Sequence, residues 1–257
     1  MANLKLLTRA DDAGLNRTTN RAIRASVKQG IVKNVSLLAN APKIEDAAEL
    51  LHDLSDMVDF GLHVCLAAEW TSPRYRPIAG SSGLTRADGS FPATIPELAA
   101  LEPSAEAVAE EVAAQYERLC SLGFNIAYVD EHMLSGSITE VRDGIVSVAS
   151  RESLIYDREL AESAAIGPLP NWTGPGPHPG TELADHLSAT QPGTYLLVGH
   201  PGFKADEMQH LRFDWGGHDD ILQQRSRERR MFADIEIVDY CENAGITLLR
   251  YTEVRSE

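Results

Sequence analysis

Short apolar runs alternate with helical patterns along most of the chain. The apolar runs predict β-strands at residues 4–8, 31–38, 58–64, 126–129, 154–156, 194–198 and 246–251. Amphipathic spacing and capping residues predict helices at residues 19–29, 42–51, 105–122, 138–150 and 219–243. This alternation is typical of an α/β fold with a mainly parallel sheet and right-handed crossovers. With about seven such units and no linker between them, the sequence predicts a (β/α) barrel formed as one domain over residues 1–257.

Two long segments interrupt this alternation. Residues 68–100 are rich in Pro, Gly, Ser and Arg, and residues 163–180 contain five prolines. Long irregular insertions in a compact α/β domain are usually functional loops or interfaces. Trp70, Tyr75 and Trp172 lie in these insertions, where they either offer aromatic faces to a sugar or pack the loops down. The first insertion is compatible with a substrate lid or with a homodimer contact.

The 257-residue chain carries a formal net charge of −15. This charge argues against nucleic acid and anionic membranes as partners, although it is compatible with a small anionic ligand. Cys65, Cys120 and Cys241 show no paired spacing, so we expect neither a disulfide framework nor a thiolate zinc site. No apolar stretch approaches the ~20 residues of a membrane span, and no signal-peptide pattern precedes the first strand. We therefore expect a cytoplasmic protein.

Side chains that can do chemistry recur where the predicted strands end. They are Asp11 and Asp12, then His63, then the run Asp130, Glu131 and His132, and finally His200. Barrel enzymes gather their catalytic groups at the carboxyl ends of the strands, so we expect one shared site. The carboxylates of the third group are expected to orient the His132 imidazole. Singly, each residue has a plainer interpretation: an Asp can cap the following helix, and His63 can be a core histidine.

The residue types in this set favour a metal-dependent hydrolase. Adjacent carboxylates repel each other unless positive charge lies between or beside them, so one of Asp11 and Asp12 is expected to bind a metal and the other to act as a base. One carboxylate and two imidazoles form a three-ligand site that leaves positions for water and substrate. Such a metal lowers the pKa of a bound water toward ~7, and a histidine across the site can protonate the leaving group. This chemistry suits an amide or an ester.

The segments around these residues match a known family in their order along the chain. They are residues 10–15 with 20–23, residues 30–32 with 35–37, and residues 61–64, 130–133 and 199–202. Together they resemble the YdjC-like carbohydrate deacetylase family, distant relatives of the family 4 carbohydrate esterases. The resemblance implies a distorted (β/α) barrel. It also implies metal-dependent removal of an N-acetyl group from an amino sugar or a short chito-oligosaccharide.

The resemblance also implies roles for individual residues. It makes Asp11 the general base and His200 the general acid or oxyanion partner. The ligands of one divalent ion, zinc or magnesium, become Asp12, His63 and His132. Arg158 matches the arginine that holds the base in the related esterases. Where this chain has Ala13 the family usually has Phe, and residues 133–136 lack the family's further histidines, which leaves the choice of sugar open.

Two alternatives to a deacetylase follow from the same residues. A metal-dependent phosphoesterase on this barrel would need more cationic groups near the ligands than the sequence provides. A non-catalytic sugar-binding protein would be expected to have lost the base or a ligand, and here all are present. Cys65, two residues after His63, is expected to be a buried structural residue.

Overall fold

The computed structural model describes residues 4–80, 83–216 and 220–254. The strands among them form one eight-stranded sheet in the order β5-β4-β3-β2-β1-β7-β6, with β8 beside β1. All the paired strands run parallel. They are β1 (Leu4–Ala13), β2 (Asn34–Leu37), β3 (Asp59–Val64), β4 (Ile126–Glu131), β5 (Ile155–Tyr156), β6 (Gly167–Pro168), β7 (Gly193–Gly199) and β8 (Thr247–Leu249).

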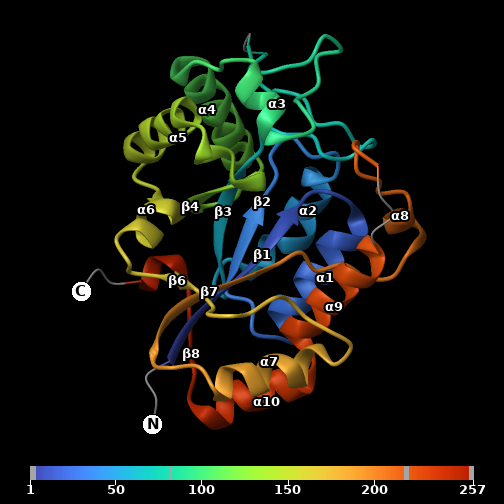
Figure 1. Ribbon diagram of the computed structural model, residues 1–257, viewed down its shortest axis with the longest axis vertical. Helices are drawn as coiled ribbons and strands as arrows, with labels where there is room; N and C mark the ends of the chain where they lie inside the picture. Colours follow the sequence, from blue (N-terminus) through green and yellow to red (C-terminus); the bar gives the residue numbers. More distant parts are fainter. Residues whose placement is uncertain (1–3, 81–82, 217–219, 255–257) are drawn as a thin grey trace.

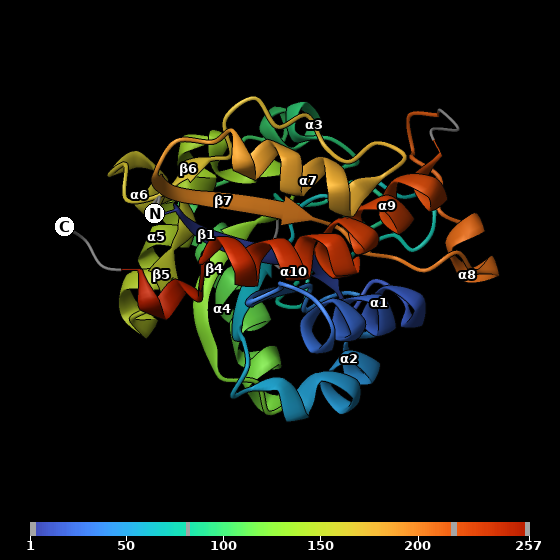
Figure 2. The same ribbon diagram turned by 90° about the horizontal axis from the view of Figure 1, so that it is seen from below.

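Helices pack around the outer face of the curled sheet, as Figures 1 and 2 show. They are α1 (Arg17–Lys28), α2 (Ile44–Leu51), α3 (Ile95–Ala100), α4 (Ala105–Ser121), α5 (Thr139–Glu152), α6 (Asp157–Glu162), α7 (Pro179–Ser188), α8 (Asp206–Gln209), α9 (Ile221–Ala233) and α10 (Ile235–Ala244). Short 3₁₀-helices occupy His52–Leu54, His132–Ser137 and Tyr251–Glu253. β2 and β3 are buried at every position, as expected for parallel strands covered on both faces.

β1 lies at the centre of the sheet. One edge of it pairs with β7, and the other pairs first with β8 along residues 5–7 and then with β2 from residue 9 onward. Among the described residues no ladder joins the two outermost strands, β5 and β6. We call this opening between β5 and β6 the seam. The structure confirms the expected α/β fold, a distorted barrel of parallel strands, and shows where the distortion lies.

The prediction of one long helix at residues 219–243 is wrong. The described part of this segment forms two helices, α9 and α10, which meet at Asp234. The extended backbone of Asp234 (ψ 142°) ends the first helix. The Asp234 carboxylate pairs with Arg230 one turn back, at 2.8 Å. Residue 219 lies outside the described residues. The sequence pattern also missed α3, α6, α7, α8 and the two-residue β6, all of which lie in or beside proline-rich or loop-like segments.

The insertion at residues 68–100 is tied to a second loop across the carboxyl ends of the strands. Trp70 and Phe213 form an antiparallel bridge, and the Asp214 amide donates to the Glu69 carbonyl at 2.7 Å. This contact makes one wall of the site described below. None of the helices in the described residues is both long and apolar enough to traverse a bilayer.

Candidate active site

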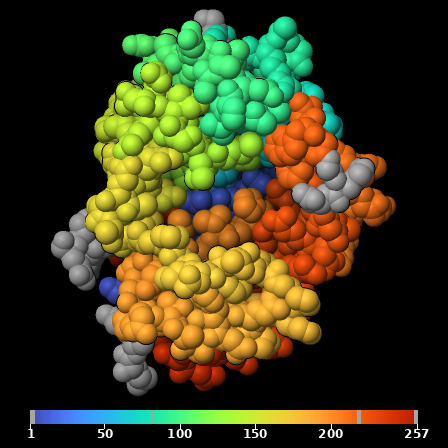
Figure 3. All heavy atoms as spheres, viewed as in Figure 1, coloured from blue at the N-terminus to red at the C-terminus, as the bar shows by residue number. Residues whose placement is uncertain are grey.

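Asp11 and Asp12 face the same cleft because β1 stops being regular there. Successive side chains of a strand point to opposite faces. The pairing of β1 with β2 shifts register between Ala10 and Ala13, and Asp12 has a φ of +68°. Asp tolerates this left-handed conformation better than most residues do. Both carboxylates therefore line a cleft of about 550 Å³ together with His63, His132 and other residues. Figure 3 shows the hollow, whose floor includes atoms of β1 (blue) and β7 (orange).

Three donor atoms converge in this cleft. His63 Nε2 lies 3.8 Å from Asp12 Oδ1, His132 Nδ1 lies 3.7 Å from the same oxygen, and the two nitrogens are 3.2 Å apart. A point about 2.1 Å from all three atoms exists, which matches Zn–N and Zn–O bond lengths of roughly 2.0–2.2 Å. All three residues are buried, at 1–6% exposure. The triangle therefore has the size and the donor set of a three-ligand metal site.

The hydrogen bonds on the far sides of the imidazoles support this interpretation. His63 Nδ1 contacts Asp130 Oδ2 at 2.6 Å, and His132 Nε2 contacts Glu69 Oε2 at 2.8 Å. A neutral imidazole that donates from one nitrogen has a lone pair on the other. The two facing nitrogens are then both acceptors, beside Asp12 Oδ1, which has no hydrogen-bond partner among the described residues. With both imidazoles neutral, three lone pairs converge at one point, and this arrangement suits a bound cation.

The same demand for positive charge governs the acid–base properties of these residues. Burial alone would lower the pKa of His63, but Asp130 and Asp11 outweigh burial and raise it to about 9. Burial would raise the pKa of Asp12, yet the Arg225 guanidinium lowers it well below its ordinary value. Arg225 Nη2 lies 2.6 Å from Asp12 Oδ2, so it holds the carboxylate while leaving Oδ1 free.

A second group of possible ligands, Asp11, His63 and Asp130, lies beside the first. The guanidinium of Arg9 already occupies it. Arg9 donates to both oxygens of Asp11, at 2.8 and 3.1 Å, and its Nη2 lies 3.2 Å from Asp130 Oδ2. A metal there would sit against a permanent positive charge. The metal-binding geometry thus belongs to the group that contains Asp12.

Arg9 is the arginine that holds Asp11. Burial would raise the pKa of Asp11, but Arg9 lowers it, so the carboxylate stays ionised. Arg9 also pairs with Asp157 and donates to the Tyr251 hydroxyl at 3.0 Å. Arg158, expected from the resemblance at this position, lies elsewhere: it is bidentate on Glu131, at 2.6 and 2.7 Å. Arg158 is a residue of α6, which follows β5, and its guanidinium binds Glu131 at the end of β4. Arg9, by contrast, lies in β1 itself.

The carboxylate that orients His132 also differs from the expectation. Asp130 reaches His63 on the neighbouring strand, because β3 and β4 place residues 63 and 130 in register. Glu131 turns away to Arg158, to Tyr156 and to the Gly136 amide at 2.8 Å. The partner of His132 is Glu69, from the insertion that begins at residue 68.

His200 lies at the end of β7 on the opposite side of the cleft. Its backbone amide donates to Glu228 Oε2 at 2.7 Å, and its Nδ1 lies 3.4 Å from the same oxygen. Burial would lower the pKa of His200, but the carboxylate of Glu228 raises it above its ordinary value. The protonated imidazole is thereby favoured in a partly exposed position, as an acid facing a ligand requires.

The three aromatic residues predicted to contact sugar occupy different places. The Trp70 ring is stacked on Phe213 at 4.7 Å and faces the Arg225 guanidinium, with 2% exposure. Tyr75 is buried edge-on to His132. Trp172 lies outside this cleft, against His186 and near the seam. Trp215, which the sequence did not single out, continues the stack on Phe213 and is 53% exposed, so it is the aromatic ring open at the mouth.

Cys65 does not contribute a donor atom to the group of Asp12, His63 and His132. Its thiol contacts the Ala67 carbonyl at 3.2 Å, and its backbone is held by Gln115. Burial raises the pKa of this thiol well above its ordinary value. Cys65 is therefore a buried thiol within the structural network behind the site.

Besides Trp215, four charged residues of the site were missed: Arg9, Glu69, Arg225 and Glu228. Two signals were available in the sequence. Residues 9 and 11 are two apart on a strand and therefore share a face. In α9 the buried positions Ile221, Arg225, Glu228 and Phe232 follow the spacing of a helix's inner face, and two of them are charged. Glu69 had no such signal, because it lies in an irregular loop.

The fold and the site define a parallel α/β-barrel protein with an Asp-His-His group at the carboxyl ends of its strands. The chain belongs to the YdjC-like protein family, whose model matches residues 5–243. It is 23% identical over 258 residues to the carbohydrate deacetylase of Thermoanaerobacter pseudethanolicus, with 96% of this chain and 98% of that protein covered. The carbohydrate deacetylase of Vibrio cholerae serotype O1 is 28% identical over 165 residues, which cover 64% of this chain and 63% of that protein.

A solved structure shares the fold over its whole length. It is a protein of Enterococcus faecalis V583 to which cleavage of cellobiose phosphate is ascribed. The TM-score is 0.79 at 18% identity, with 99% of this chain and 100% of that chain covered. At this level of identity the likeness concerns the architecture.

Proposed function

We propose that the protein is a metal-dependent carbohydrate deacetylase that hydrolyses the N-acetyl group of an amino sugar or a short chito-oligosaccharide. The observation that carries this proposal is the convergence of Asp12 Oδ1, His63 Nε2 and His132 Nδ1 beside a separate, ionised Asp11. The two related carbohydrate deacetylases support the same class of substrate.

Asp12, His63 and His132 would hold the divalent ion. When bound, such an ion polarises a carbonyl and acidifies water. Asp130 and Glu69 fix the two imidazoles so that the correct nitrogen faces the ion, and Arg225 holds the second oxygen of Asp12. Such supporting partners commonly set metal affinity by factors of 10–100.

Asp11 acts as the general base in this proposal. It takes a proton from the attacking water, whose oxygen bonds to the carbonyl carbon of the acetamide. Arg9 keeps Asp11 ionised and oriented by two hydrogen bonds. His200, held by Glu228, gives a proton to the amide nitrogen as the carbon–nitrogen bond breaks. The products are the free amine and acetic acid, which ionises to acetate by losing its proton to solvent. The proton taken by Asp11 restores His200 through solvent.

Acetate release tests the proposal directly. We expect the purified protein to contain about one divalent ion per chain and to release acetate from N-acetylglucosamine or its β-1,4 oligomers. Chelation should abolish this release, and added metal should restore it. Bound metal without acetate release from any of these sugars would exclude the proposed substrate class, and chelator-resistant release would exclude the metal-dependent mechanism.

Glu69→Gln should weaken metal binding by about 10–100-fold, because the charge that supports the His132 imidazole is removed while the side chain keeps its shape. His132→Ala should remove the metal altogether. Titration with zinc and a competing chelator measures both effects. Glu97→Gln is the matched control, because Glu97 lies in the same insertion, is exposed and pairs with Arg86. This variant should bind zinc with the affinity of the wild type. Unchanged affinity in His132→Ala would overturn the ligand assignment.

A further inference from the structure

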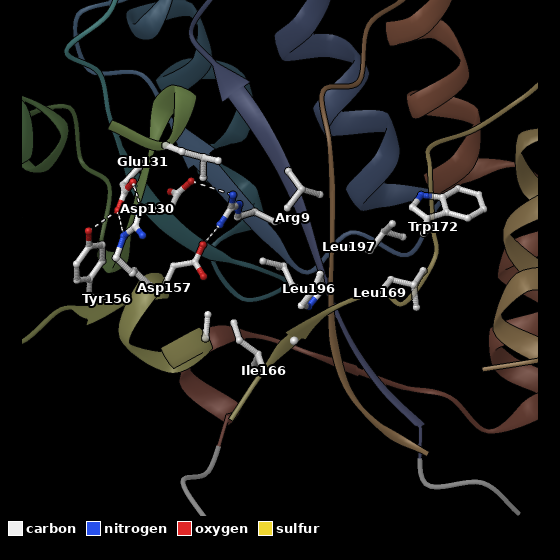
Figure 4. Close-up of a pocket in the computed structure, with 16 residues that line it drawn as sticks. Arg9, Asp130, Glu131, Tyr156, Asp157, Ile166, Leu169, Trp172, Leu196 and Leu197 are labelled. Atoms are coloured by element: carbon white, nitrogen blue, oxygen red, sulfur yellow. Dashed lines mark hydrogen bonds and ion pairs between the residues drawn. The ribbon is translucent and has the colours of Figure 1, made fainter. Parts of the chain in front are cut away.

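A second cavity, of about 420 Å³, lies at the seam. It is next to the cleft of about 550 Å³ that is lined by Asp12, His63 and His132, which we call the metal-site cleft. We call the second cavity the seam pocket. Figure 4 shows charged side chains from β1, β4 and α6 on one side of it, and apolar side chains from β7 and from the loop after β6 on the other. The volume falls within the roughly 300–1,000 Å³ of typical small-molecule sites. The proposed deacetylation does not use this cavity.

The seam pocket adjoins the metal-site cleft. The residues that line both are Arg9, Glu131, Leu134 and Val198. Leu134 stands at the rim between the two spaces and is 70% exposed. Met133 and Leu134 have φ values of +55° and +57°, which are costly for residues of this type. Such local strain collects at functional sites, and here it presents an apolar side chain to both spaces.

The charged groups of the seam pocket are already engaged with one another. Arg9 pairs with Asp157 and Asp130, and Glu131 is held by Arg158 and the Tyr156 hydroxyl. Among the described residues Asp130 Oδ1 is a buried acceptor without a partner. The rest of the lining is mainly apolar: Leu134, Ala161, Ile166, Pro168, Leu169, Trp172, Leu196, Leu197 and Val198. A polar ligand would find few free partners here, whereas an apolar group would remove this surface from water.

We propose that the seam pocket binds an apolar substituent of the substrate, an alkyl or aryl aglycone attached to the sugar, while the sugar's N-acetyl group lies at the metal site. For the sugar part this inference rests on the proposed deacetylase function. For the apolar part it rests on the pocket alone. The enzyme would then prefer amino-sugar glycosides with a hydrophobic aglycone over the free sugar.

The preference should appear as a dependence of kcat/KM on alkyl length. Burial of each methylene contributes about a fourfold gain, so burial of only two of the further methylenes of the octyl chain should raise kcat/KM for octyl N-acetyl-β-glucosaminide roughly tenfold or more above that of the methyl glycoside. Ala161→Trp should fill the pocket from the exposed surface of α6. It should remove the octyl advantage and leave the methyl rate unchanged. Ala189→Trp, at another exposed alanine, is the matched control and should behave as the wild type.

Binding of octyl β-glucoside, which has no amide, separates this inference from the proposed function. By calorimetry below its micelle concentration it should bind more tightly than methyl β-glucoside, and Ala161→Trp should abolish the difference. If octyl β-glucoside binds in this way but no glycoside releases acetate, the proposal that the seam pocket binds an aglycone is supported and the deacetylase proposal fails.

If acetate is released from the octyl and methyl substrates with equal kcat/KM, only the proposal for the seam pocket is overturned. Should Ala161→Trp lose the methyl rate, it is replaced by Trp172→Ala, which removes an apolar side chain that lines the seam pocket but not the metal-site cleft. An undiminished octyl advantage in this variant would also overturn the inference.

Discussion

Asp11→Asn is expected to lower kcat/KM for acetate release by about 10²–10⁴-fold, because the amide cannot accept the proton of the attacking water. The metal content should not change. Asp12, His63 and His132 supply the converging donor atoms, while both oxygens of Asp11 are occupied by Arg9. Steady-state kinetics and metal analysis on the same preparation measure the two quantities.

Asp157→Asn is the matched control for this effect. Asp157 also pairs with Arg9 but does not line the metal-site cleft, so it reports what a disturbed Arg9 does by itself. We expect the kcat/KM of this variant for acetate release to fall by less than about tenfold, far less than on removal of the base. Equal losses in the two variants would mean that Asp11 acts only by positioning Arg9. Loss of metal in Asp11→Asn would make Asp11 a ligand.

Arg9→Met is expected to lower the free energy of unfolding by about 3–5 kcal/mol. Arg9 is only 6% exposed and pairs with three carboxylates, Asp11, Asp130 and Asp157. Methionine occupies much of the same volume but leaves these charges buried without compensation. Urea denaturation of the metal-free protein measures the effect. Arg24→Met, in an ion pair on the surface, should change stability little, because exposed pairs contribute little.

The loss in Arg9→Met should depend on pH. In the wild type Arg9 holds the pKa of Asp11 below its ordinary value, so this contact stabilises the fold above about pH 4 and loses its contribution as the pH falls through the folded pKa. Without Arg9, burial raises that pKa, and the cost disappears once the carboxylate is protonated. The difference in stability should therefore be largest near pH 7 and narrow as the medium becomes acidic. A difference independent of pH would show that packing, not charge, is what Arg9 supplies.

Much of the barrel could be predicted from local patterns. The strands at residues 58–64 and 194–198 and the helix at 105–122 match β3, β7 and α4 closely, because apolar runs and amphipathic spacing are local properties of the chain. The sequence pattern did not predict α7 and β6, because prolines in and around them obscure the periodicity. It also did not predict the break at Asp234, because the helical spacing continues through that residue.

By itself the sequence also placed Asp11, Asp12, His63, His132 and His200 at strand ends, since the direction of a parallel strand fixes which end meets its neighbours. Only the tertiary structure decided which group supports which. The register of β3 and β4 places Asp130 beside His63. Glu69, from an insertion, contacts His132. The arginine that binds Asp11 comes from β1 and not from α6. These partners lie on different elements, and their contacts depend on distances across the barrel. No local pattern along the chain encodes such distances.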